Sequence, residues 1–146
     1  MSKQEIDIML EHYDNMHERD LRLFSCWCVR QVWHLLTDDR SKNAVIVAEK
    51  YVVGNVTDDG LAVARARAWI AYENSNKLVA EAAALTACSN EFLYHCVKKC
   101  AVITREAAVK RSFFSYIYKK RLRAIAETQA AYLREHFSPF LQEGKK

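Results

Sequence analysis

The chain has 146 residues, of which 51% are hydrophobic and 27% charged, a composition typical of one globular domain and unlike that of a disordered segment. Its net charge of +4 is unevenly distributed, because residues 98–134 carry ten Lys and Arg against two Glu, whereas residues 1–60 carry an excess of acids. With only three Gly and one Pro, the chain lacks the turns that an all-β domain needs about every ten residues. We therefore expect an all-α fold, an irregular bundle of five to seven helices.

The first helix is predicted over residues 3–18, because Ser2 followed by Glu5 forms a capping box. The N-terminal residues are polar and acidic and lack the apolar core of a signal peptide. No apolar run approaches the ~18 residues that a membrane span requires. These features predict a cytoplasmic protein without membrane association, in which the five cysteines are reduced thiols.

The second helix is predicted to begin after Asp20 and to reach Leu36. Its sequence is apolar on nearly every side of the helix. Six residues form one apolar stripe, and further apolar residues such as Trp27 and Trp33 lie outside that stripe. A helix that is apolar all round is buried. We therefore expect residues 21–36 to form the central helix of the bundle. The stripe consists of Leu21, Phe24, Cys28, Val32, Leu35 and Leu36.

Capping residues delimit the next helices. Asp38 and Asp39 precede a third helix that Gly54 ends, and Thr57 caps a fourth helix from about residue 58. The alanine-rich run over residues 61–88 favours helix, and we expect the polar residues 74–76 to divide it into two.

The C-terminal third is predicted to hold two further helical segments. Ser89 or Asn90 caps a helix that reaches Thr104 and that either ends there or continues into the last helix. The last helix is expected over residues 106–137, because the residue before Pro139 is disfavoured in helical geometry. Residues 1–140 then form a single domain, followed by a short polar tail at 141–146.

Several motifs occur together in the first and last parts of the chain: LRLF at 21–24, RQVWHLL at 30–36, AVIVAEKY at 44–51 and QAAYLR at 129–134. In this combination the chain resembles small uncharacterised bacterial and phage proteins that are helical and rich in alanine. The resemblance covers less than half of the chain, and this chain departs from the pattern at residues 26–28 and 138–140. It implies a shared helical core and a regulatory or inhibitory role on a host protein, and it assigns no catalytic residue.

Metal binding is the first chemistry to weigh, because cysteine and histidine recur. Cys96 and Cys100 lie one helical turn apart and His95 is adjacent. A zinc site needs four converging ligands, so that His34 or Cys88 would have to join this set through the fold. We expect structural thiols here, with no metal and no other cofactor.

Catalysis by a cysteine nucleophile is the second chemistry that the cysteines suggest. Cys26 and Cys28 point about 200° apart on a helix, and the neighbouring Trp27 and Trp33 give them apolar surroundings. Burial raises the pKa of a thiol and makes it inert. His34 is interpreted as a structural helical histidine. Because the glycine-rich phosphate loops are also absent, the sequence predicts no catalytic site.

The basic region of the last helix is the candidate binding surface. If Tyr118 points into the core, cations and aromatic rings share the opposite face of this helix. Such a face suits a protein partner, because Tyr, Phe and Arg are favoured in interface hot spots, and it also suits phosphates and stacked bases. The third interpretation is a basic face that only solvates the bundle. The candidate surface consists of Phe113, Tyr116, Lys119, Lys120, Arg123 and Arg134.

The function predicted from the sequence is that of a non-enzymatic helical protein–protein interaction module, in the manner of a phage regulator or inhibitor of a host protein. The alternative is a nucleic-acid-binding accessory protein that uses residues 98–134. An enzyme whose site assembles from distant Cys and His residues is the third class. The oligomeric state and the identity of the partner are left open by the sequence.

Overall fold

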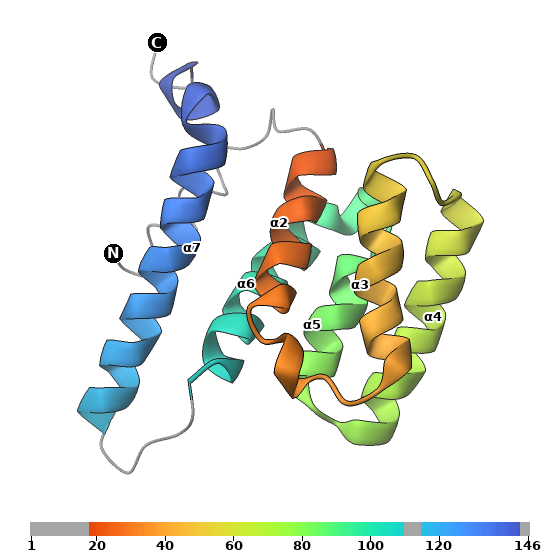
Figure 1. Cartoon of the computed structure of the whole chain (residues 1–146), viewed down its shortest axis with the longest axis horizontal. Coiled ribbons are helices and arrows are strands. Elements are labelled where there is room, and N and C mark those ends of the chain that lie inside the picture. Colours follow the sequence, from red (N-terminus) through yellow and green to blue (C-terminus); the bar gives the residue numbers. More distant parts are fainter. Residues whose placement is uncertain (1–17, 110–114, 144–146) are drawn as a thin grey trace.

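A computed structural model describes residues 18–109 and 115–143, with side chains at 18–109 and 119–136. These residues confirm the predicted all-α class, because they form six α-helices and two short 3-10 turns and no strand (Figure 1). None of the described helices is both long and apolar enough to cross a bilayer. The elements are α2 (Glu18–Arg30), η1 (Trp33–Leu35), α3 (Asp39–Val52), α4 (Asp58–Ser75), α5 (Leu78–Thr86), η2 (Asn90–Phe92), α6 (Leu93–Ala107) and α7 (Ser115–Glu143).

The helix α5 occupies the centre of the bundle. It packs against α2, α3, α4 and α6, while α4 and α7 lie at opposite edges (Figure 1). Eight of its nine residues are buried. The sequence predicted residues 21–36 as the central helix, and α2 is indeed largely buried, but the shorter and more apolar α5 is the more completely enclosed element.

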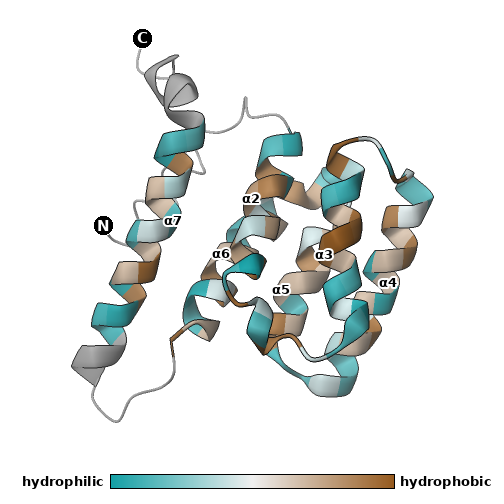
Figure 2. Ribbon diagram, in the orientation of Figure 1, coloured by the Kyte–Doolittle hydropathy of each residue, from teal (hydrophilic) through white to brown (hydrophobic). Residues whose placement is uncertain are grey.

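Small side chains allow the helices around α5 to approach closely. The seams between α3, α4 and α5 are built largely from alanine. In Figure 2, the ribbons of α3 and α4 carry both hydrophilic and hydrophobic residues. A buried alanine loses no side-chain entropy and leaves space for the facing backbone. The alanines in these seams that are at most 3% exposed are Ala44, Ala48, Ala64, Ala68, Ala71, Ala82, Ala83 and Ala84.

The predicted caps of the third and fourth helices are confirmed. The Asp38 carboxylate accepts a hydrogen bond from the backbone N–H of Arg40 at 2.9 Å, and the Thr57 hydroxyl accepts one from Gly60 at 3.1 Å. Gly54 follows the last turn of α3 with a φ of +80°, in the left-handed region that glycine favours. Asn76, also left-handed with a φ of 53°, ends α4 and separates it from α5 where a break was predicted.

The second helix is shorter than predicted. It already includes Asp20, which therefore is not its cap, and it ends at Arg30 instead of reaching Leu36. Beyond Arg30, the backbone forms tighter bonds between residues three apart, such as that from Leu35 N–H to the Val32 carbonyl at 2.9 Å. The Arg30 guanidinium lies over the Trp33 ring, 4.1 Å from its centroid. The packing of this turn outweighs the helical propensity of its sequence.

The C-terminal helices also differ from the prediction. α6 begins at Leu93 after η2, where Ser89 takes the N-cap position without a capping side-chain hydrogen bond, and it ends at Ala107. The last helix therefore starts at Ser115 instead of residue 106, and it continues through Pro139 to Glu143. Pro139 has no backbone N–H to donate to the carbonyl four residues earlier, and only four further residues of α7 follow it. The first predicted helix, residues 3–18, lies outside the described residues except for Glu18.

The tight alanine seams generate a test of the packing. Replacing Ala68 by Leu is expected to lower the free energy of unfolding by about 1–3 kcal/mol, because the added atoms overfill a seam in which Ala68 is 0% exposed. Ala66, on the exposed side of the same helix, provides the matched control, and Ala66→Leu is expected to stay within about 0.5 kcal/mol of the parent. Urea unfolding followed by circular dichroism measures both, and equal effects of the two substitutions would contradict the packing described.

Candidate functional site

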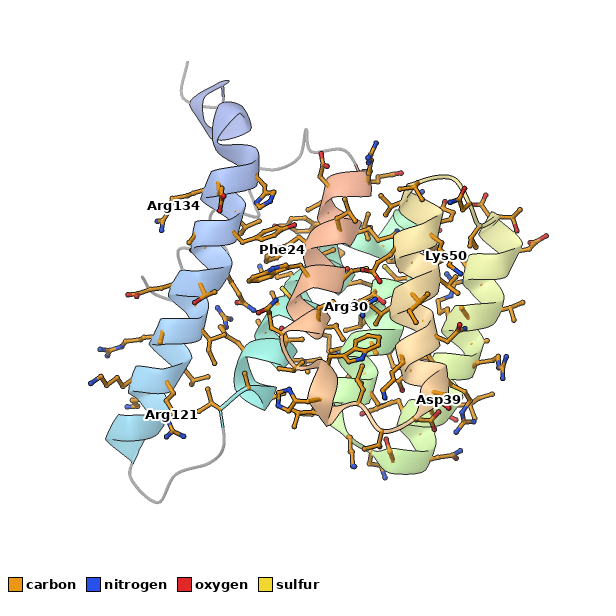
Figure 3. The ribbon with its side chains drawn as sticks, in the orientation of Figure 1. Phe24, Arg30, Asp39, Lys50, Arg121 and Arg134 are labelled. Carbon is orange, nitrogen blue, oxygen red and sulfur yellow. The ribbon has the colours of Figure 1, made fainter. Side chains whose placement is uncertain are left out.

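The second half of α7 is attached to the bundle by a stack of aromatic rings. Trp27 of α2 stacks on Tyr132 of α7 with 4.5 Å between ring centroids, and Tyr132 in turn stacks on His136 at 4.0 Å. Phe24 completes the group at 5.7 Å from Tyr132, and its label lies between α2 and α7 in Figure 3. Leu133, which is 0% exposed, adds apolar contact on the same side of the helix. This half of α7 is therefore a structural element of the bundle.

A cleft of about 240 Å³ lies beside this attachment and is lined by residues of α2, α6 and α7, including Trp27, Ile125 and Gln129. Gln129 is 2% exposed, and its Nε2 donates a hydrogen bond to the carbonyl of Ala101 at 3.1 Å. Its Oε1 has no hydrogen-bond partner among the described residues. A buried carbonyl oxygen without a partner costs free energy. The buried amide is thus only half satisfied.

This geometry predicts that Gln129→Met is close to neutral, within about 1 kcal/mol in the free energy of unfolding. The substitution removes the bond to the Ala101 carbonyl and two longer ones, to the Thr104 hydroxyl at 3.5 Å and the Cys28 sulfur at 3.8 Å, but it also removes the unpartnered oxygen. The Ala101 carbonyl keeps its bond from the Thr104 hydroxyl at 3.2 Å. Leu133→Ala serves as the contrast and is expected to cost about 2–5 kcal/mol, because it opens a cavity in the same contact. Urea titration compares the two. A loss above about 2 kcal/mol for Gln129→Met would mean that Oε1 is satisfied in solution.

The first half of α7 carries most of the predicted cations. Lys119, Lys120 and Arg123 are exposed, and so is Arg121, which the sequence interpretation did not include. None of the ion pairs formed among the described residues involves these four side chains. We call these four residues the α7 basic cluster.

The helical geometry groups four of the predicted residues on one face. At 3.6 residues per turn, Lys119, Lys120, Arg123 and Arg134 fall within a sector of about 100°. Arg134 is exposed and points away from the bundle in Figure 3. Glu127, also exposed, falls within the same sector between Arg123 and Arg134 and interrupts its positive charge.

Two predicted aromatic members of the surface are not placed. Tyr116 belongs to α7, but its side chain is outside the described set, and Phe113 lies outside the described residues altogether. The structure therefore brings together the cations of the candidate surface and leaves its aromatic part a prediction.

The predicted burial of Cys26 and Cys28 is confirmed, with each 1% exposed. Burial raises the pKa of the Cys26 thiol to about 12 and also raises that of Cys28. Cys100 is 0% exposed, and burial raises its pKa as well. At neutral pH these three thiols stay protonated, and a protonated thiol is a poor nucleophile.

The structure separates Cys100 from the other residues weighed for metal binding. The Cys100 thiol donates to the carbonyls of Ser25 and Ala82 at 3.6 Å each, inside the core. Cys96 faces a different neighbour, and His34 and His95 are exposed. Within the described part of the chain, no three His, Cys, Asp or Glu side chains are placed to hold a metal ion.

A cluster that the sequence did not reveal forms around Cys88 and Cys96. The thiols of Cys88 and Cys96 act on each other electrostatically, and the positive charge of Arg22 acts on both. The interaction with Cys88 lowers the pKa of Cys96 to about 7, and the positive charges of Arg22, Lys99 and Arg65 act in the same direction. The interaction with Cys96 raises the pKa of Cys88. The sequence signal for this cluster was Arg22, a charged residue between the apolar Leu21 and Leu23.

No family model matches the chain, and no curated protein or solved structure resembles it at a significant level. The resemblance to small bacterial and phage proteins therefore stays a prediction.

Proposed function

We propose that the chain is a non-enzymatic interaction module that binds an acidic protein surface through the α7 basic cluster. The observation that carries the proposal is that four cations within five residues are exposed and take no part in the ion pairs formed among the described residues. They belong to a helix at the edge of the bundle, so that a partner can reach them (Figure 1). Basic surfaces of this kind steer and orient acidic partners.

Repulsion within the cluster supports this role. Lys119 and Arg123 are four residues apart on one helix and carry the same charge, an arrangement that destabilises an isolated helix by a few tenths of a kcal/mol. An acidic surface placed over the cluster removes this repulsion and adds attraction. The rest of the bundle then serves as the rigid support, with α7 held by the ring stack at Trp27 and Tyr132.

A protein partner suits the charge distribution better than a nucleic acid does. Exposed carboxylates of Glu127 and Glu135 lie further along the same helix. A polyanion that followed the helix would meet these carboxylates, and each phosphate near them would be repelled. A protein surface can place its acidic residues against the first half of α7 alone. The resemblance to small phage proteins supports regulation or inhibition of a host protein as the role of this contact.

The proposal predicts that Lys119→Glu, Lys120→Glu and Arg123→Glu together weaken binding to a labelled glutamate-rich peptide by more than about ten-fold. The reversed charges turn attraction into repulsion, and the loss should shrink as salt is raised because screening weakens both. Fluorescence anisotropy at several salt concentrations measures the affinity. A matched control reverses three lysines away from α7, at positions 42, 50 and 77, and is expected to keep most of the affinity.

The same titrations with duplex DNA and with single-stranded RNA distinguish protein binding from the alternative function, nucleic-acid binding. If either nucleic acid bound more tightly than the peptide and lost its affinity in the α7 variant, the function would be nucleic-acid binding by residues 98–134. If neither probe distinguished the α7 variant from its control, the basic cluster would have no binding role.

A further inference from the structure

The cleft between α2, α6 and α7 has a mainly apolar lining and is large enough for a small molecule. Trp27 of α2, Ala108 at the end of α6 and Ile125 of α7 supply apolar side chains to it. Its volume is about 240 Å³, whereas an engineered apolar cavity of about 150 Å³ in another protein binds benzene. One substituted ring, or two fused rings, therefore fit within it.

Gln129 belongs to the floor of this cleft, which we call the Gln129 cleft. Its Nε2 lies 3.5 Å from Thr104 Oγ1 and 3.8 Å from Cys28 Sγ, and both of these residues also line the cleft. The same nitrogen donates to the Ala101 carbonyl at 3.1 Å. Exchanging the two ends of the amide would place Oε1 against that carbonyl, with two acceptors facing each other. Oε1 is therefore the polar atom of Gln129 that is left without a partner among the described residues.

The hydroxyl groups beside Gln129 are directed elsewhere. The Thr104 hydroxyl donates to the Cys100 carbonyl at 2.9 Å, and the Thr128 hydroxyl donates to the Ala124 carbonyl at 3.0 Å. Neither hydrogen is available to Oε1 while these bonds last. A buried acceptor without a donor costs free energy, and a ligand that brings a donor recovers this cost.

Charge restricts the ligand to neutral molecules. None of the described residues that line the cleft has an acidic or basic side chain that is charged at neutral pH. Burial raises the pKa of the Cys28 thiol, so that this group also stays uncharged. A charged ligand would lose its hydration in the cleft without gaining a counter-ion.

We propose that the Gln129 cleft binds a small neutral aromatic molecule with one N–H or O–H group, which donates a hydrogen bond to Gln129 Oε1. The indole ring of Trp27 favours an aromatic body over an aliphatic one, because aromatic rings gain from offset or edge-to-face contact with each other. The ligand contacts α2, α6 and α7 at once, so its binding stabilises the attachment of α7 to the bundle. This site is separate from the α7 basic cluster and does not depend on the function proposed for that cluster.

Two probes of nearly equal shape test the hydrogen bond. Indole has a ring N–H, whereas benzofuran has a ring oxygen in its place and can only accept. We expect the protein to bind indole about ten-fold more tightly than benzofuran, the difference that one hydrogen bond produces. Heteronuclear NMR titration measures both affinities and follows the side-chain amide signals of Gln129. Equal affinities for the two probes, or no binding of indole, would overturn the proposal.

Gln129→Met removes the acceptor while the protein is expected to keep its fold. We expect the affinity for indole to fall about ten-fold, to that of benzofuran, while the affinity for benzofuran changes by less than about two-fold. A preference for indole that survives this substitution would mean that another acceptor holds the N–H, and the role assigned to Oε1 would be wrong.

Ala108→Phe tests the location of the site. Ala108 is exposed and lines the cleft, so a phenyl ring at this position can fill the cleft without displacing the core. We expect this variant to bind neither probe, and indole to raise the unfolding temperature of the parent but not of the variant. Ala66→Phe, at an exposed position of α4, is the matched control and should keep the parent affinities. Circular dichroism checks that both variants are folded, and unchanged binding of indole by Ala108→Phe would place the ligand elsewhere and contradict the proposal.

Discussion

A guanidinium inside the bundle with only neutral oxygens as hydrogen-bond acceptors is the constraint on which this structure depends. Arg22 leaves α2 and reaches the Thr86 carbonyl at the end of α5 and the Asn90 side chain at the start of η2. The last carbonyls of a helix have no partner within the helix, and a cation there also interacts favourably with the helix dipole. One side chain therefore fixes the end of the central helix, joins it to α2, and supplies the positive charge beside Cys88 and Cys96.

Local chemistry accounts for what the sequence predicted correctly. Asp38, Thr57, Gly54 and Asn76 act through bonds or dihedral angles within a few residues, so the bounds of α3 and α4 and the break before α5 could be read directly. The end of α2 could not be predicted from the sequence, because the tight turn after Arg30 depends on tertiary packing. The end of α7 was also mispredicted. The residue before a proline is disfavoured in helical geometry, yet α7 continues through Pro139 to Glu143.

The α7 basic cluster and the surroundings of Cys88 and Cys96 differ in how far the sequence could lead to them. The cations of α7 follow one another closely, and helical periodicity alone places Lys119, Lys120 and Arg123 on one face, while Arg121 falls outside that face. The thiol cluster depends on Arg22, which is 64 residues from Thr86, and on a turn that folds Cys88 back onto α6. No periodic pattern encodes such a meeting. The sequence instead grouped Cys96 with Cys100, and the structure separates them into different surroundings.

The short connection at Asn76 has a consequence for the order in which the bundle assembles. Only two residues join α4 to α5, and five join α3 to α4, so these three helices meet with little loss of chain entropy. The contact of Gln129 with Cys28 spans 101 residues, and α2 and α7 come together only when that large loop closes. Contacts between distant residues form slowly. An α3–α4–α5 unit that condenses first, followed by closure of α2 and α7 over it, is the folding route that this topology favours.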